Sequence, residues 1–276
     1  MPEGDTIHRL AHRMGKDLVG RTLTALSVQG VGVVPELAGA SVEGVEARGK
    51  HLLVHFEPGW SLRVHLGMKG RWRRTPAVPG RGRYAASPAS VQITAGPVAW
   101  TCAGAYQAEL IRTRHLSTHP RLSRLGPDLL APSPDIAAMV RRASFPGYRH
   151  RAVATCIMDQ TVASGLGNVY KSEVLFLEGI HPALPVHALA EGALAKVFDT
   201  AHRLMRDSVS RRRRETVPLV LRPSPNSPRL WVYRREGDPC LRCRRAVVRI
   251  VQEGRSTYFC PSCQPEDPPQ ADRKKE

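Results

Sequence analysis

Long apolar runs are absent from this sequence of 276 residues, and no stretch approaches the roughly 20 apolar residues of a membrane-spanning helix. The chain start, Met1-Pro2-Glu3-Gly4-Asp5-Thr6, also lacks the basic and then apolar layout of a secretory signal. From these two absences we expect no membrane partner. We therefore expect a cytoplasmic protein, nucleoid-associated if bacterial, in which thiols stay reduced.

Acidic residues are also scarce: 24 Asp and Glu stand against 41 Lys and Arg, a formal net charge of +17. Such a charge creates a long-range positive field that favours a polyanionic partner. Nucleic acid is the favoured interpretation, although ribosomal and membrane-surface proteins share this composition.

Cysteine is rare, with six residues in all, and four of them form two pairs near the C-terminus. The other two, Cys102 and Cys156, are isolated and are predicted to be small buried apolar residues.

The apolar pattern changes along the chain and predicts an α+β multidomain fold. A helix over residues 5–18, capped by Asp5 or Thr6, precedes short β-type runs at 23–28, 51–56, 61–66, 91–94 and 98–102, which suggest a β-sandwich. Residues 73–88 are predicted to form a mobile loop. Later segments have helical spacing, at 135–142, 151–163, 169–178 and 188–210.

Prolines and changes of composition predict the domain bounds. We expect a β-sandwich domain with an N-terminal helix at 1–122, and a helical domain at 123–228. A zinc finger should follow at 229–266 and a disordered tail at 267–276.

Two Cys-x-x-Cys pairs lie 16 residues apart and predict a metal centre. Four thiolates at this spacing bind Zn²⁺ tetrahedrally, and they leave no open position for water, so the ion is structural. The residues between the pairs fit a β-hairpin with a Glu253-Gly254 turn. We therefore expect one structural Zn²⁺ in a β-hairpin zinc finger with four cysteine ligands, Cys240, Cys243, Cys260 and Cys263. Its five arginines suggest a phosphate-facing surface, with an ordinary solvated face as the alternative.

A second pattern lies at residues 159–173, DQTVASGLGNVYKSE. Gly165 and Gly167 permit tight turns, Asn168 stands where a helix N-cap belongs, and Lys171 follows in the first turn. Free N–H groups and an ammonium at a helix start can bind phosphate. An ordinary helix–loop–helix with a capping asparagine is equally compatible with this stretch.

Together, three motifs resemble the formamidopyrimidine-DNA glycosylase/endonuclease VIII family: the chain start, residues 159–173 and the finger that ends in CPSCQ. The similarity covers residues 2–264 in the family's own order, and Gly4 together with residues 118–128 is closer to endonuclease VIII.

The resemblance implies a bifunctional DNA glycosylase and apurinic/apyrimidinic-site lyase. In such an enzyme the β-sandwich domain at 1–122 would be catalytic, and the helical domain at 123–228 would be a helix-two-turn-helix DNA-binding domain. Removal of Met1 would leave Pro2 with a free secondary amine, whose pKa of about 8 lies well below the 10.4 of lysine. This amine would attack C1′ of the damaged nucleotide and form a Schiff base, from which β- and δ-elimination cut the strand. Glu3 would be a general acid/base, and Lys50 a proton donor at the lesion.

The remaining site residues implied by the resemblance contact DNA. Arg255 would bind phosphates around the lesion and assist the second elimination, and Met68 would fill the space of the flipped base. Without the family match, Lys50 would be a solvated lysine at a strand end and Met68 a core methionine. The other predicted DNA contacts are Arg124, Asn168, Tyr170 and Lys171.

The expected partner is damaged double-stranded DNA, with single-stranded or bubble DNA as an alternative, and the expected state is a monomer. Oxidised pyrimidines are favoured because residues 101–109 lack the Arg-Phe pair of the purine-directed branch, although Met68 is typical of that branch. The alternatives are therefore a purine-directed glycosylase or a non-enzymatic zinc-containing DNA-binding protein.

Overall fold

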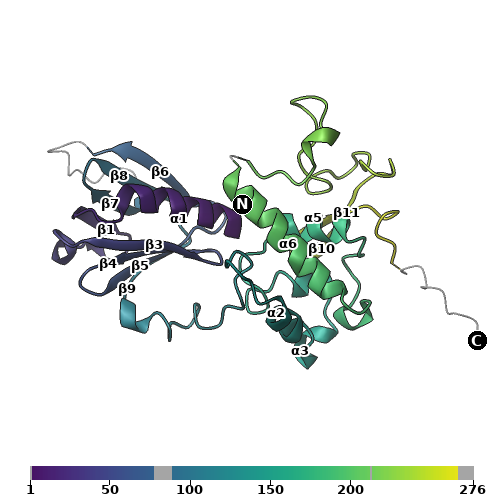
Figure 1. Ribbon diagram of the computed structural model, residues 1–276, viewed down its shortest axis with the longest axis horizontal. Helices are drawn as coiled ribbons and strands as arrows, with labels where there is room; N and C mark the ends of the chain where they lie inside the picture. The colour runs from purple at the N-terminus through teal and green to yellow at the C-terminus, as the bar shows by residue number, and fades with distance from the viewer. Residues whose placement is uncertain (1, 78–88, 212, 267–276) are drawn as a thin grey trace, which may run out of the picture. The chain divides into compact units, whose positions relative to one another are not determined.

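The computed structural model describes residues 2–77, 89–211 and 213–266, and the chain divides into two units, Met1–Arg124 and Leu125–Glu276 (Figure 1). The predicted tail at 267–276 and most of the predicted loop at 73–88 lie outside the described residues. The predicted separation of a helical domain from a finger within the second unit stays a prediction.

The first unit is the predicted β-sandwich of two antiparallel sheets (Figure 1). One sheet has the order β2-β1-β7-β8-β6, and the other the order β3-β4-β5-β9. The strands of the first are β1 (Leu23–Val28), β2 (Gly32–Val33), β6 (Arg71–Pro76), β7 (Ala89–Ala95) and β8 (Val98–Ala103). Those of the second are β3 (Val42–Arg48), β4 (His51–Phe56), β5 (Trp60–His65) and β9 (Gln107–Arg112). Short 3-10 turns occur at Pro35–Leu37 and Thr113–His115.

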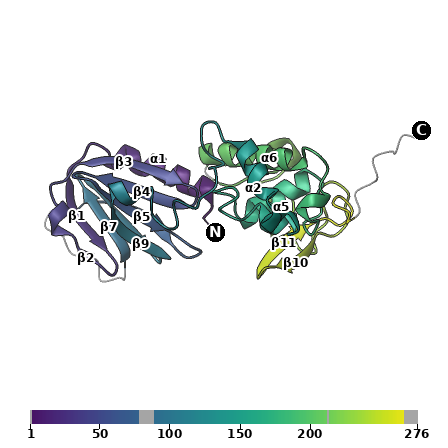
Figure 2. The same ribbon diagram turned by 90° about the horizontal axis from the view of Figure 1, so that it is seen from below.

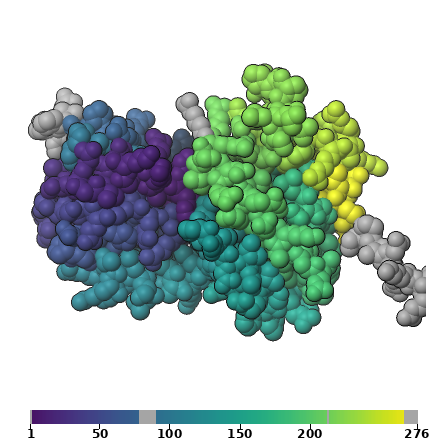
Figure 3. Space-filling model, in the orientation of Figure 1, coloured from purple at the N-terminus to yellow at the C-terminus, as the bar shows by residue number. Residues whose placement is uncertain are grey.

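Helix α1 (Gly4–Leu18) contacts β3 and β4 and adds its apolar face to the sandwich core. Ile7, Met14 and Leu18 are fully buried in this face, as the 3.6-residue spacing predicts. The opposite face of α1 forms part of the surface of this unit (Figure 3). The predicted cap by Asp5 or Thr6 is wrong: Glu3 is the N-cap residue, without a side-chain cap bond, and its carbonyl accepts the amide of Thr6 at 2.9 Å.

The outer face of the β3-β4-β5-β9 sheet carries a buried polar cluster. Arg63 is fully buried, and its guanidinium lies 3.1 Å from a carboxylate oxygen of Glu109. The other oxygen of Glu109 lies 3.0 Å from Nε2 of His119, which follows β9. The rings of His51 and His65 on this face are tilted by 43° to one another, with centroids 4.9 Å apart. This face is therefore held by ionic and polar contacts rather than by apolar packing.

The second unit contains helices and one hairpin. Its elements are α2 (Ile136–Ala143), α3 (Pro146–Arg149), α4 (Val153–Cys156), α5 (Asn168–Leu177), α6 (Ala193–Ser210), β10 (Val248–Gln252) and β11 (Arg255–Phe259), with 3-10 turns at Val186–Ala188 and Leu219–Leu221. Figure 2 shows the hairpin of β10 and β11 beside α5, and α5 contacts both β11 and α6. Cys102 in the first unit and Cys156 here are buried, as predicted.

Two helix predictions in this unit are wrong in extent. The helix expected over residues 151–163 ends at Cys156, because side chains beyond it bind backbone groups locally: Asp159 accepts the amide of Thr161, and Gln160 binds the carbonyl of Met158 and the amide of Gly165. The helix expected from residue 188 begins at Ala193, after Gly192 with a φ of 75°. None of the helices in the described part of the chain has the length and apolar character of a membrane-crossing segment.

Candidate active site and zinc centre

The chain start is held by the first turn of α1. Glu3 is fully buried, has extended backbone angles and begins the helix as its N-cap residue. Pro2 therefore stands directly before the cap of a rigid helix and is half-buried. A proline amine fixed in this way would be a localised nucleophile, although nothing in the described residues tests that role.

Lys50 lies in the two-residue turn between β3 and β4. Arg48 pairs with His51, and Gly49 has a φ of 56°, a conformation that glycine adopts without strain in a tight hairpin turn. The side chain of Lys50 is half-buried. Burial, then the charge of Arg63 and then the charge of Lys50 lower the pKa of His65 to about 4, so this histidine is neutral at pH 7.

Met68 lies in a tight turn after β5 and is 76% exposed. This exposure disagrees with the alternative of a core methionine. The sequence analysis missed Tyr106, which is also exposed and lies against this turn. A Cβ atom on Gly67 would come within 2.7 Å of Cβ of Tyr106, so the turn must have glycine there. Met68 and Tyr106 come from separate loops, and the close approach of Tyr106 to Gly67 shows that these loops lie side by side.

The four predicted cysteines meet at one point. Their sulfur atoms all lie within 4.8 Å of one another, with Cys243 and Cys260 at 3.4 Å and Cys240 and Cys263 at 3.9 Å. Tetrahedral Zn²⁺ with bonds of about 2.3 Å requires sulfur–sulfur distances of about 3.8 Å. Burial and then the neighbouring thiols raise the pKa of Cys263, so ionisation of all four needs a cation between them. The donor set and its spacing fit a structural zinc ion.

The finger hairpin has the predicted Glu253-Gly254 turn. Both residues have positive φ, 46° and 72°, as a type I′ turn requires. Arg255 follows at the start of β11, is exposed, and makes no side-chain hydrogen bond or ion pair with the residues that the structure describes. Two of the other finger arginines have internal partners: Arg242 lies over the ring of Phe176, and Arg249 pairs with Glu236.

Helix α5 presents its first polar residues to this hairpin. Asn168 is the first helical residue and not the predicted N-cap, which is Gly167. Its amide donates to the carbonyl of Ser256 at 2.8 Å, and Nζ of Lys171 donates to Oγ1 of Thr257 at 2.7 Å. Lys171 and Tyr170 are fully buried, and the guanidinium of Arg214 lies 4.8 Å from the ring centroid of Tyr170. Phosphate contacts by these residues stay predictions.

Glu173 is a further structural residue that the sequence analysis missed. It is fully buried and accepts the backbone amides of Trp231 (2.7 Å), Val232 (3.0 Å) and Tyr233 (2.9 Å), as well as the hydroxyl of Thr216. These donors belong to the segment that leads into the finger. The sequence shows an acidic residue five positions after Asn168, but the hydrogen-bond partners of Glu173 lie 43 to 60 residues further along the chain.

The structure thus brings Asn168, Lys171 and the finger hairpin together in the second unit. Tyr170 lies next to Lys171 on α5. Five predicted site residues lie in the first unit: Pro2, Glu3, Lys50, Met68 and Arg124. Arg124 is exposed, and its predicted DNA contact is untested.

Comparison with protein families matches three models in chain order. Residues 1–102 match the formamidopyrimidine-DNA glycosylase N-terminal domain, residues 125–217 the H2TH domain of the same glycosylase, and residues 237–265 the zinc finger found in FPG and IleRS.

Similar proteins cover nearly the whole chain. A probable endonuclease 8 2 of Streptomyces coelicolor is 36% identical over 96% of this chain and 94% of its own length. A DNA-(apurinic or apyrimidinic site) lyase Nei2 of Mycolicibacterium smegmatis is 33% identical over 96% and 99%. The structure of Lactococcus lactis Fpg with abasic-site DNA shares the fold, with a TM-score of 0.78 at 22% identity over 96% and 100% of the two chains.

These matches define the class of the protein: it is a DNA-repair enzyme, a DNA glycosylase with apurinic/apyrimidinic-site lyase activity. Within that class, the chain belongs to the formamidopyrimidine-DNA glycosylase/endonuclease VIII family, as its motifs predicted.

Proposed function

We propose that this enzyme excises oxidised pyrimidines from DNA through a Schiff base formed by Pro2. The neutral secondary amine attacks C1′, the bond to the damaged base breaks, and the base leaves with a proton. Loss of a C2′ proton from the resulting iminium expels the 3′ phosphate, and a second elimination expels the 5′ phosphate. Water then hydrolyses the imine and restores Pro2. The observation that carries this proposal is a proline at the second position, fixed by α1, in a chain that matches the family from end to end.

Two neighbouring groups supply the protons in this scheme. Glu3 follows the nucleophile directly and is placed by its N-cap position, so its carboxylate acts as general acid/base during opening of the sugar ring. Lys50 donates a proton at the lesion from the β3–β4 turn, where the turn fixes its backbone.

The partner in this proposal is damaged double-stranded DNA, bound by a monomer. One zinc ion adds two charges while four thiols lose their protons, so the formal net charge falls only from +17 to +15 and the chain stays strongly basic. Arg255 is exposed and has no partner among the described residues, as a phosphate ligand should be before DNA binds. Arg124, also exposed, would contact the backbone of the duplex. Met68, with Tyr106, would occupy the space that the flipped nucleotide leaves.

The choice of pyrimidines rests on the relatives and on one loop. The endonuclease 8 proteins of Streptomyces coelicolor and Escherichia coli are 36% and 30% identical to this chain. Residues 101–109 lack an Arg-Phe pair and offer Tyr106 instead. The exposed Met68 favours the second candidate, a purine-directed glycosylase, so lesion assays must decide between the two.

Borohydride trapping tests the mechanism and the lesion together. The native enzyme should become covalently linked to DNA that contains an abasic site or thymine glycol, and less readily to DNA with 8-oxoguanine opposite cytosine. A non-enzymatic DNA-binding protein would not be trapped at all.

The assignment of Pro2 needs a blocked amine. Pro2→Gly, or a tag on the N-terminus, should abolish trapping while binding to undamaged DNA persists, and the same tag on the C-terminus is the matched control. Trapping that survives the N-terminal block would exclude Pro2 as the nucleophile, and a strong 8-oxoguanine preference would overturn the substrate assignment.

A further inference from the structure

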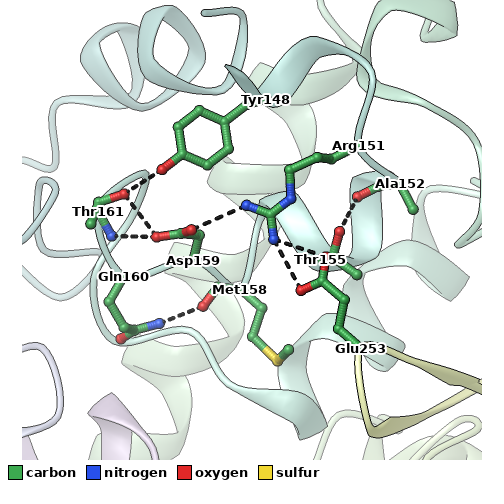
Figure 4. A network of polar contacts seen from close by, with 9 residues as sticks. All are labelled: Tyr148, Arg151, Ala152, Thr155, Met158, Asp159, Gln160, Thr161 and Glu253. Atoms are coloured by element: carbon green, nitrogen blue, oxygen red, sulfur yellow. Dashed lines mark hydrogen bonds and ion pairs between the residues drawn. The ribbon is translucent and has the colours of Figure 1, made fainter. Parts of the chain in front are cut away.

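Arg151 links two parts of the second unit that are far apart in sequence (Figure 4). One terminal nitrogen donates to Asp159 at 3.2 Å, and the other lies 3.0 Å from both carboxylate oxygens of Glu253 in the finger turn. Figure 4 shows the guanidinium between the two carboxylates, at the side of Tyr148, whose ring centroid lies 5.4 Å from it. A planar guanidinium offers two separate terminal nitrogens to two carboxylates in a fixed geometry, whereas lysine has a single ammonium nitrogen.

Asp159 gives Arg151 a fixed position. Its other oxygen accepts the amide of Thr161 at 2.9 Å and the hydroxyl of the same residue at 2.8 Å. That hydroxyl also lies 2.7 Å from the phenol oxygen of Tyr148. Although burial opposes its charge, the bonds from Thr161 and Arg151 hold the pKa of Asp159 below its usual value. Asp159 is therefore ionised at neutral pH and anchors the guanidinium, which reaches out to the finger.

Glu253 is a central residue of the type I′ turn and lies two positions before Arg255. Both side chains are long and exposed, so an unpartnered Glu253 carboxylate would be within reach of the Arg255 guanidinium. Arg151 occupies both oxygens of that carboxylate instead. Arg255 has no ion pair with any described residue, although Glu253 lies only two positions before it in the chain.

We infer that Arg151 is a positioning residue, which engages Glu253 and thereby keeps Arg255 available for the phosphates of lesion DNA. This inference rests on the proposed function, since it assigns Arg151 to the same DNA-binding step. Arg151 itself need not contact DNA. Arg151 acts by binding the carboxylate of Glu253, which would otherwise compete with DNA phosphate for Arg255.

The test compares Arg151→Ala, Glu253→Gln and the double variant, with Arg203→Ala as the matched control. Arg203 also pairs with a carboxylate on this unit, Asp199, but it lies on α6. Each purified, zinc-loaded protein is assayed on abasic-site DNA for the rate of borohydride trapping, the ratio of β,δ- to β-elimination products, and the salt dependence of binding. Zinc content and thermal unfolding check that each variant is folded.

Arg151→Ala should lower the yield of the second elimination about 5-fold, the upper range for one exposed ion pair, with the trapping rate within about 2-fold of the native value. In Glu253→Gln, both the yield of the second elimination and the trapping rate should stay within about 2-fold of the native values, because no carboxylate remains there to compete with phosphate for Arg255. Adding Glu253→Gln to Arg151→Ala should restore the product ratio. In an Arg255→Ala background, Arg151→Ala should cause no further loss.

The opposite pattern would overturn the inference. If the network were only a structural tether, Glu253→Gln would be as harmful as Arg151→Ala and the double variant would not recover. Should Arg151→Ala fail to fold, Arg151→Gln removes the same charge and keeps most of the side-chain volume. Native enzyme that is not trapped would refute the proposed function, whereas trapped native enzyme with an unaffected Arg151→Ala variant would refute only the role of Arg151.

Discussion

Replacing Glu173 with glutamine should loosen the attachment of the finger to α5. The carboxylate faces four donors, and each of its oxygens accepts two of them. A glutamine amide can keep its oxygen on the amides of Val232 and Tyr233, and Thr216 can rotate its hydroxyl to accept from the new NH₂ group. The amide of Trp231 would then face another donor and lose its partner.

The expected loss follows from this geometry. One buried N–H without a partner costs about 1–3 kcal/mol, and the remaining bonds lose the strengthening that a charged acceptor gives. Glu173→Gln should therefore lower the free energy of unfolding of the second unit by about 2–4 kcal/mol. For a unit of this size, that corresponds to a fall of roughly 4–16 °C in melting temperature.

Thermal and urea unfolding, together with the rate of zinc release to a chelator, measure this effect. The matched control is Glu191→Gln, because Glu191 lies in the same unit but is exposed. Zinc release should be faster in Glu173→Gln than in the control. A stability loss below about 1 kcal/mol, with unchanged zinc release, would refute the argument that all four donors depend on an ionised carboxylate.

Two further predictions concern the first unit. Burial and then Arg63 lower the pKa of His65 to about 4 from an ordinary value of 6.5. The neutral histidine therefore contributes to the free energy of unfolding above pH 6.5. This contribution, up to about 3 kcal/mol, is lost as the pH falls from 6.5 toward 4. Urea unfolding across this range should show the loss, and His65→Gln should flatten it; an equal slope in the variant would contradict the prediction. Gly67→Ala should cost about 1–3 kcal/mol and reduce lesion excision, because the residue has a φ of 62° and its Cβ would collide with Tyr106. Gly15→Ala, in open space on α1, should be neutral or stabilising, and equal effects of the two substitutions would argue against strain at Gly67.

Local sequence patterns predicted those helices, strands and turns whose formation depends on residues close together in the chain. The spacing of Ile7, Met14 and Leu18 located α1, and the apolar run at 51–56 coincides with β4. The cysteine spacing predicted the metal centre because two Cys-x-x-Cys pairs at this separation are typical of four-thiolate zinc sites. The two-residue turn before Arg255 was also readable from Glu253-Gly254.

Contacts between distant residues could not be predicted in this way. The helix expected over residues 151–163 stops at Cys156 because Asp159 and Gln160 bind the backbone of the turn, and helical spacing says nothing of such competition. The phosphate contact of Lys171 stays a prediction, but the hydrogen bond of its ammonium to Thr257, 86 residues away, had no signal in the sequence. Tyr106 gave no signal, because its importance depends on packing against Gly67.

The polar side of α5 also determines whether the finger can be isolated from the rest of the second unit. Asn168, Lys171 and Glu173 all reach out of one helix into the segment that surrounds the metal. We therefore expect the finger of this chain to depend on α5 for its stability. If it were grafted onto another scaffold without α5, its backbone would lose partners that no zinc ion can replace.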